Sequence, residues 1–166
     1  MSATRSLFRT AAEGLESPSK VLRHLNQALL KDLPEGRFVT LVYSILDTKR
    51  ATVRVANGGH PYPIVVREQT TSMTELKTEE GFPLGLMDSE YSEVGLTLQT
   101  GDRMLMYTDG AVEATNGEDQ EYGTSRLVKS LQKPSVSARS VLAEVQEFAS
   151  GGTLSDDATA IVLRRE

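Results

Sequence analysis

Two acidic turns, far apart in the sequence, carry the residue types that could bind a metal ion. Asp109 and Gly110 follow the apolar run 105–107, and the pair Asp156 and Asp157 precedes the apolar run 160–163. A carboxylate at the end of a strand is held rigidly and still reaches solvent, which suits a hard divalent cation. Alone, Asp109 could equally cap the next segment or belong to an ordinary turn. The second acidic pair favours the metal site.

A glycine-rich segment supplies further candidates for lining a site. Residues 57–61 are Asn-Gly-Gly-His-Pro. Gly58 and Gly59 permit backbone conformations and close approaches that other residues do not, so the segment is either a site-lining loop or a tight bend. His60 either contributes to the site or only hydrogen-bonds its own loop. We therefore treat Gly58, Gly59, His60 and Gly110 as candidate lining residues.

The apolar pattern predicts the elements that position these residues. Ser17 and Pro18 predict the start of an amphipathic helix that ends near Leu33, and a weaker helical pattern precedes it at 6–13. Strands are expected at 38–47, 51–56, 62–67, 73–76, 92–98, 103–108 and 160–163. Further helices are expected at 123–132 and 137–150. This order predicts an α+β fold with helices outside a sheet or sheet pair.

Some of these segments carry more specific predictions. The strand at 38–47 is apolar on both faces, so we expect it in the middle of a layered sheet, paired with 51–56 as a hairpin. A turn at 100–102 should join 92–98 to 103–108 as a second hairpin. The acidic segment 111–122 is predicted to be a mobile, solvated loop.

Length and composition limit the class of protein. A chain of 166 residues fits one domain, which we divide into a helical pair (1–33), a sheet core (37–110), and helices with a closing strand (111–166). The chain has no Cys, which fits the reducing cytoplasm. The net charge of -5 and the scattered basic residues argue against nucleic acid. No apolar run approaches the roughly 20 residues that span a bilayer, so we expect a cytoplasmic protein without a membrane partner.

A series of short motifs in a fixed order resembles a known family. The motifs are Arg-Phe-Val-Thr at 37–40, Asn-Gly-Gly-His-Pro at 57–61, Phe-Pro-Leu-Gly at 82–85, Gly-Asp at 101–102, Tyr-Thr-Asp-Gly at 107–110, Glu-Tyr-Gly at 121–123 and Asp-Asp-Ala-Thr at 156–159. Together they resemble the bacterial branch of the PPM-type, protein phosphatase 2C-like, serine/threonine phosphatases, near the stage II sporulation protein E and sigma-factor-regulator members. The resemblance implies an α-β-β-α sandwich of antiparallel sheets flanked by helices, with two Mn²⁺ or Mg²⁺ ions at one end.

The resemblance also implies roles for particular residues. Asp109 corresponds to one metal ligand and the Asp156–Asp157 pair to another, with Asp156 favoured by its spacing to Thr159. No catalytic residue is implied beyond the metal ligands. The implied substrate is a phosphoserine or phosphothreonine on a small regulatory protein of a sigma-factor pathway. An upstream sensor domain or a dimer partner is a further expectation.

The sequence departs from the family pattern at its N-terminal side. It contains neither the early acidic residue nor the Asp-x-x-Gly-His-Gly motif whose aspartate bridges both metals in the family. The domain is therefore expected to be N-terminally incomplete. As a protein of this length alone, it should bind metal weakly, show little phosphatase activity and self-associate through exposed strand edges. The alternative is a non-catalytic interaction module that keeps the PPM-like fold.

Overall fold

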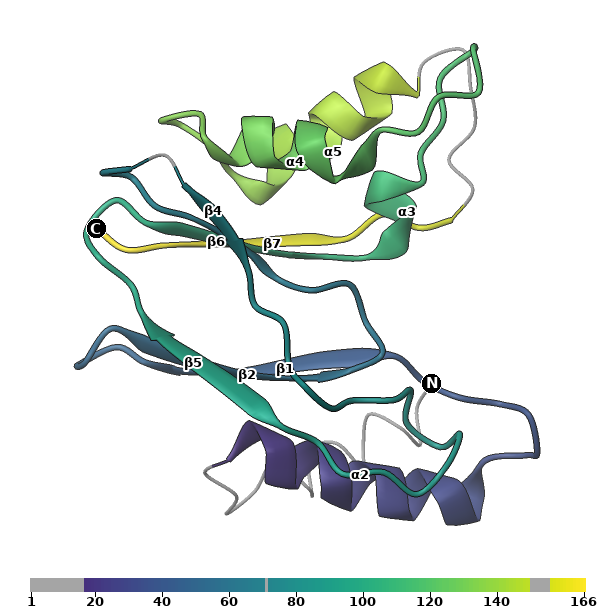
Figure 1. The fold of residues 1–166 in the computed structure, drawn as a ribbon. Coiled ribbons are helices and arrows are strands. Elements are labelled where there is room, and N and C mark those ends of the chain that lie inside the picture. The colour runs from purple at the N-terminus through teal and green to yellow at the C-terminus, as the bar shows by residue number, and fades with distance from the viewer. Residues whose placement is uncertain (1–16, 71, 150–155) are drawn as a thin grey trace. The chain divides into compact units, whose positions relative to one another are not determined.

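The computed structural model describes residues 17–70, 72–149 and 156–166, so the predicted helix at 6–13 lies outside it. The chain divides into two compact units, each built around an antiparallel sheet (Figure 1). The first unit comprises Met1–Tyr62 and Leu76–Thr97, and the second comprises Pro63–Glu75 and Leu98–Glu166, each in its described part. None of the described helices is both long and apolar enough to cross a membrane.

The first unit packs one helix against a sheet of order β1-β2-β5. Its elements are α2 (Pro18–Asp32), β1 (Leu41–Asp47), β2 (Thr52–Gly58) and β5 (Glu93–Thr97). The predicted start of α2 is confirmed, because the Ser17 side chain accepts a hydrogen bond from the Lys20 N–H and Pro18 opens the helix. The predicted hairpin of β1 and β2 is also confirmed. The buried stripe of α2 forms a core with residues of β2 and of the loop before β5. The helix contributes Val21, Leu22, Leu25 and Leu29, and the other members include Ala56, Leu84 and Tyr91.

For the described residues, the predicted place of β1 in the middle of a sheet is wrong. β1 begins at Leu41 and lies at one end of its sheet, where β2 is the strand that pairs with it among the described residues. Its residues are mostly half-buried, and Leu46 is 41% exposed. Apolar residues on both faces of a strand predict that both faces are covered by other layers. They do not predict how many strands pair with its edges.

The second unit has a sheet of order β4-β3-β6-β7, with helices on one of its faces (Figure 1). Its elements are β3 (Ile64–Val66), β4 (Met73–Glu75), β6 (Arg103–Tyr107), α3 (Asp109–Val112), α4 (Gly123–Leu131), α5 (Ala138–Phe148) and β7 (Ala160–Arg164). Ser137 starts α5 with a capping box, as its place before the apolar stripe predicted. The core forms between sheet and helices from residues that include Ile64, Leu105, Leu127, Leu131, Val141 and Val145.

The predicted hairpin of 92–98 with 103–108 is also wrong. β5 pairs with β2, whereas β6 pairs with β3 and β7, so the tight turn joins strands of two different sheets. Asp102 fixes this turn to the end of β3: its carboxylate accepts hydrogen bonds from the Gln99 N–H at 2.7 Å and the Glu68 N–H at 3.1 Å, and from the Arg67 guanidinium. These donors outweigh the effect of burial, so the pKa of Asp102 lies below the ordinary value.

The segment 111–122 is only in part the solvated loop that its charge predicted, because its acidic residues are exposed and some of its other residues are buried. It includes the rest of α3, and its apolar residues Ala111, Ala114 and Tyr122 are buried. The Asn116 side chain accepts hydrogen bonds from the N–H groups of Glu118 and Gln120, which closes the turn. The acidic residues correctly predicted the exposed side of this segment, whereas they gave no indication of its buried apolar side.

Candidate metal centre

Asp109 lies just beyond the end of β6, an inner strand of the second sheet. β6 stops at Tyr107, Thr108 follows in an extended conformation, and Asp109 begins the single-turn helix α3. The side chain of Asp109 is exposed, and its Oδ1 accepts a hydrogen bond from the Gly110 N–H at 3.0 Å. The predicted arrangement of a strand that ends on an exposed carboxylate is therefore confirmed.

The segment before β7 runs beside this turn. The Thr108 N–H donates to the Thr159 carbonyl at 3.1 Å, and the Thr108 hydroxyl accepts from the Thr159 N–H at 2.9 Å. The same hydroxyl donates to the Asp157 carbonyl at 3.2 Å. These bonds bring together two acidic segments that are about fifty residues apart in the sequence, with separations of 49 and 51 for the side-chain bonds.

Gly110 makes this close approach possible. A Cβ atom at Gly110 would lie 2.8 Å from the carbonyl oxygen of Asp157 and 3.0 Å from that of Asp156. Both distances are shorter than a methyl group tolerates, so only glycine fits here without a backbone shift. Gly110 therefore lines the contact between the two acidic segments.

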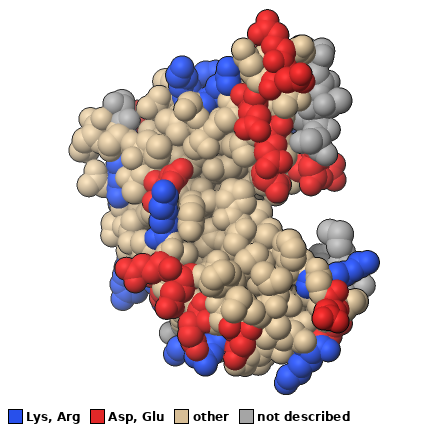
Figure 2. Space-filling view, turned by 45° about the vertical axis from the view of Figure 1, so that its right-hand side comes forward, with Lys and Arg blue, Asp and Glu red and all other residues tan. Residues whose placement is uncertain are grey.

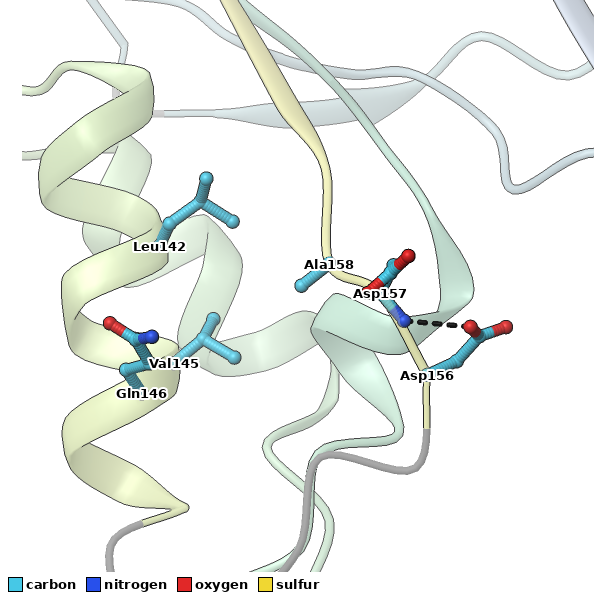
Figure 3. A pocket seen from close by; sticks show the side chains of 6 residues that line it. All are labelled: Leu142, Val145, Gln146, Asp156, Asp157 and Ala158. Carbon is cyan, nitrogen blue, oxygen red and sulfur yellow. Dashed lines mark hydrogen bonds between the residues drawn. The ribbon is translucent and has the colours of Figure 1, made fainter.

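Asp156 and Asp157 are both exposed. The Oδ1 atom of Asp156 accepts a hydrogen bond from the Asp157 N–H at 2.7 Å (Figure 3). The carboxyl group of Asp156 lies on the side of its segment away from α5, whereas Ala158 points toward that helix (Figure 3). A hollow of about 580 Å³ lies between α5 and this segment, lined by Leu142, Val145, Gln146 and residues 156–158.

The carboxylates fit part of a divalent metal centre and not a whole one. Among the described residues, no group of three or more His, Cys, Asp or Glu side chains is arranged to hold an ion. In the same residues no Lys or Arg pairs with Asp109, Asp156 or Asp157, so their negative charge is not neutralised. Mg²⁺ is commonly held by one or two carboxylates and several waters, which these side chains could supply. A bridged pair of ions would need further ligands.

Acidic side chains reinforce the local charge. The segment 113–121 exposes Glu113, Glu118, Asp119 and Glu121. The space-filling view shows Asp and Glu side chains gathered at its upper right (Figure 2). Such a surface favours cations over anions near the acidic turns.

The other candidate lining residues belong to the first unit and form a braced bend. Asn57 is buried, and its side chain accepts from the His60 N–H and donates to the His60 carbonyl, both at 2.7 Å. The His60 Nδ1 lies 3.2 Å from the Thr40 hydroxyl. A Cβ at Gly58 or Gly59 would meet the side chain of Leu84 or Pro83, respectively. These contacts hold the loop in place, which is the alternative left open for His60.

Thr108 links the two acidic segments, and the sequence did not single it out. Its hydroxyl makes both side-chain hydrogen bonds between the acidic turn and the start of β7. The available signal was a hydroxyl residue immediately before the aspartate at a strand end, a position where Ser and Thr commonly bond to nearby backbone.

Comparison with known proteins decides the family. The sequence matches the family described as Stage II sporulation protein E (SpoIIE) over residues 1–166. The chain belongs to the SpoIIE family. This SpoIIE-family chain is 26% identical over 157 residues to the phosphoserine phosphatase RsbU of Bacillus subtilis (strain 168), an alignment that covers 90% of the chain and 45% of RsbU. The chain thus spans less than half the length of this relative.

Solved structures share the fold of this chain. The SiaA-PP2C domain of Pseudomonas aeruginosa superimposes with a TM-score of 0.82 at 20% identity, covering 98% of this chain and 68% of that domain. The Mn-presoaked phosphatase domain of the cell fate determinant SpoIIE from Bacillus subtilis gives a TM-score of 0.64 at 20% identity, covering 98% and 72%. The predicted fold class, a PP2C-like arrangement of antiparallel sheets flanked by helices, is confirmed for this SpoIIE-family chain.

Proposed function

We propose that this chain belongs to a Mn²⁺- or Mg²⁺-dependent phosphatase that removes phosphate from serine or threonine of a regulatory protein in a sigma-factor pathway. The proposal rests on membership of the SpoIIE family and on the name of RsbU, a phosphoserine phosphatase. A cytoplasmic location, expected from the sequence, and a sensor domain or a dimer partner, expected from the family, complete the proposal.

The observation that carries the metal site is the bracing of the two acidic segments by Thr108 and Gly110. We assign Asp109 and Asp156 to the first divalent ion. When bound, such an ion would neutralise phosphoryl oxygens and activate a water molecule. The chain itself holds Asp109 on the β6–α3 turn and holds the carbonyl of Asp157 on Thr108, which limits movement of the Asp156 carboxylate relative to Asp109.

Metal binding tests this assignment independently of turnover. Mn²⁺ should bind the chain in calorimetric titrations, and Asp109→Asn or Asp156→Asn should each weaken binding at least about tenfold, since even residues behind the ligands commonly matter by that factor. Asp157→Asn should weaken it by much less, which separates the two members of the pair. Glu118→Gln removes an exposed carboxylate of the acidic segment 113–121 and serves as the matched control.

Turnover is measured on the same four variants with a phosphoserine peptide, with and without Mn²⁺. Any activity should require the metal and fall in Asp109→Asn, with Glu118→Gln unchanged. Metal affinity and metal-dependent turnover that both survive Asp109→Asn and Asp156→Asn would exclude the assignment.

The second candidate is a non-catalytic interaction module with the same fold. The lack of a complete ligand group in the described residues favours it. It predicts a protein that binds a phosphorylated regulator without releasing phosphate, in the presence or absence of Mn²⁺.

A further inference from the structure

The dipeptide Asn-Gly occurs twice in the chain, at 57–58 and at 116–117, in two different structural settings. Asn-Gly is prone to spontaneous loss of the side-chain amide, because glycine has no side chain to shield its backbone nitrogen. In this reaction the glycine nitrogen attacks the Cγ atom of the asparagine. The reaction therefore needs a backbone that is free to rotate and an asparagine amide that water can reach.

The first Asn-Gly pair is held in the sheet of the first unit. Asn57 and Gly58 are buried residues of β2, which pairs with β1 along its whole length. The Asn57 side chain is 2% exposed, and both of its polar atoms form hydrogen bonds of 2.7 Å with the backbone of His60. The paired strand prevents the rotation that would bring the Gly58 nitrogen to Cγ, so this site should react only when the strand opens.

The second Asn-Gly pair lies in a turn of the second unit. Asn116 is half-buried, Gly117 is exposed, and neither residue belongs to a helix or a strand. In the part of the chain that the structure describes, the Gly117 N–H donates no hydrogen bond. The attacking nitrogen is therefore not held away from the Asn116 side chain.

The Asn116 amide is also polarised for this attack. Its Oδ1 atom accepts hydrogen bonds from the N–H groups of Glu118 and Gln120, both at 3.0 Å. Two N–H groups at such a distance stabilise the negative charge that develops on a carbonyl oxygen when a nucleophile adds to its carbon. The leaving nitrogen, Nδ2, donates to the exposed side chain of Gln120 at 3.2 Å, a bond that solvent can replace.

We propose that Asn116 is a site of spontaneous deamidation, whereas the fold protects Asn57. The Gly117 nitrogen forms a bond to Cγ of Asn116, the bond between Cγ and Nδ2 breaks, and the Gly117 proton leaves with Nδ2 as ammonia. Water then adds to the resulting succinimide ring. Opening at Cγ gives aspartate, and opening at the backbone carbonyl carbon of Asn116 gives isoaspartate, whose backbone is longer by a methylene group.

Either product changes the acidic segment 113–121. A carboxylate replaces a neutral amide, so a segment that is already acidic gains a negative charge. The longer backbone of isoaspartate also disturbs the turn, in which the Asn116 N–H donates to the Gln120 carbonyl and the Asp119 N–H donates to the Asn116 carbonyl, both at 3.1 Å. The protein thus carries a slow chemical change whose products accumulate with the age of the molecule.

Peptide mapping by mass spectrometry tests the proposal, with Asn57 as the internal control. The folded chain and the chain unfolded in guanidinium chloride are incubated at neutral pH, and the deamidated fraction of each Asn-Gly peptide is followed over time. In the folded chain, Asn116 should deamidate at least about tenfold faster than Asn57, because Asn57 reacts only through rare opening of its strand. In the unfolded chain the two sites should react at similar rates, since their dipeptides are identical.

Two variants identify the chemistry. Gly117→Ala places a methyl group beside the attacking nitrogen and should slow the reaction at Asn116 at least about tenfold, in the folded and the unfolded chain alike. The φ angle of Gly117 is not positive, so alanine fits the turn. Asn116→Asp supplies the aspartate product as a standard for anion-exchange chromatography.

Three results would overturn the proposal. The first is an equal rate at Asn116 and Asn57 in the folded chain. The second is an Asn116 that stays intact in the folded chain while both sites react in denaturant. The third is a Gly117→Ala variant that deamidates as fast as the original chain, which would exclude attack by this nitrogen.

Discussion

Replacement of Asp102 should be among the most damaging single changes in the second unit. The side chain is 1% exposed and accepts bonds from two backbone N–H groups, those of Gln99 and Glu68, and from the Arg67 guanidinium. Asp102→Ala leaves both N–H groups without a partner, at about 1 kcal/mol each, and removes a charge-assisted bond worth about 1.5 kcal/mol or more. We expect the free energy of unfolding to fall by about 3–4 kcal/mol.

Urea denaturation followed by circular dichroism measures this loss. Asp102→Asn keeps one acceptor oxygen and should lose about half as much. Glu118→Ala, at an exposed carboxylate, should stay within about 0.5 kcal/mol of the original chain. A loss below about 1 kcal/mol for Asp102→Ala would show that the turn does not depend on this carboxylate. It would also refute the explanation of why this turn joins strands of two different sheets.

The pH dependence of stability provides an independent readout of the same group. Burial raises the pKa of Asp102, but the hydrogen bonds donated by Gln99, Arg67 and Glu68 together lower it by more. The pKa in the folded chain therefore lies below that in the unfolded chain. The stabilisation is therefore complete above the unfolded value of about 3.9 and is lost as the pH falls through that value to the lower folded one. Asp102→Asn should be less sensitive to acid over this range.

Two further substitutions test the packing of the same unit. Gly110→Ala should lower the stability by about 1 kcal/mol and should also lower the Mn²⁺ affinity, because the added methyl group would push away the carbonyl groups of Asp156 and Asp157. Gly95→Ala is the control that should be tolerated, because the nearest atoms there lie 3.4 Å away or more. Ser130→Ala should cost about 1–2 kcal/mol, and combined with Tyr122→Phe it should cost less than the sum, since the two hydroxyls share one buried hydrogen bond of 3.0 Å; additive losses would show that they act separately.

The sequence predicted local structure well wherever the signal lay within a few residues. Ser17 and Pro18 marked the start of α2, and Ser137 marked the start of α5, because helix caps depend on neighbouring backbone groups alone. The exposed Asp109 at the end of β6 followed from a strand pattern and the glycine after it.

The errors concern which segments meet. The Gly101–Asp102 turn has the composition of a hairpin turn, and only the donors of Arg67 and Glu68, more than thirty residues earlier, show that it joins two sheets. Likewise, the sequence indicated acidic residues at two strand ends, whereas their contact depends on Thr108 and on the absence of a Cβ at Gly110. Non-local partners of this kind leave no periodic signal.

The two units are interleaved along the chain, which passes from one to the other after Tyr62, Glu75 and Thr97. No single cut therefore releases either unit whole: a nick after Thr97 would separate β3 and β4 from β6, the strand to which β3 is paired. During synthesis, β3 emerges long before that partner and must wait for it, as must β6 for β7. Pairing within the second unit is therefore complete only after β7 has been synthesised.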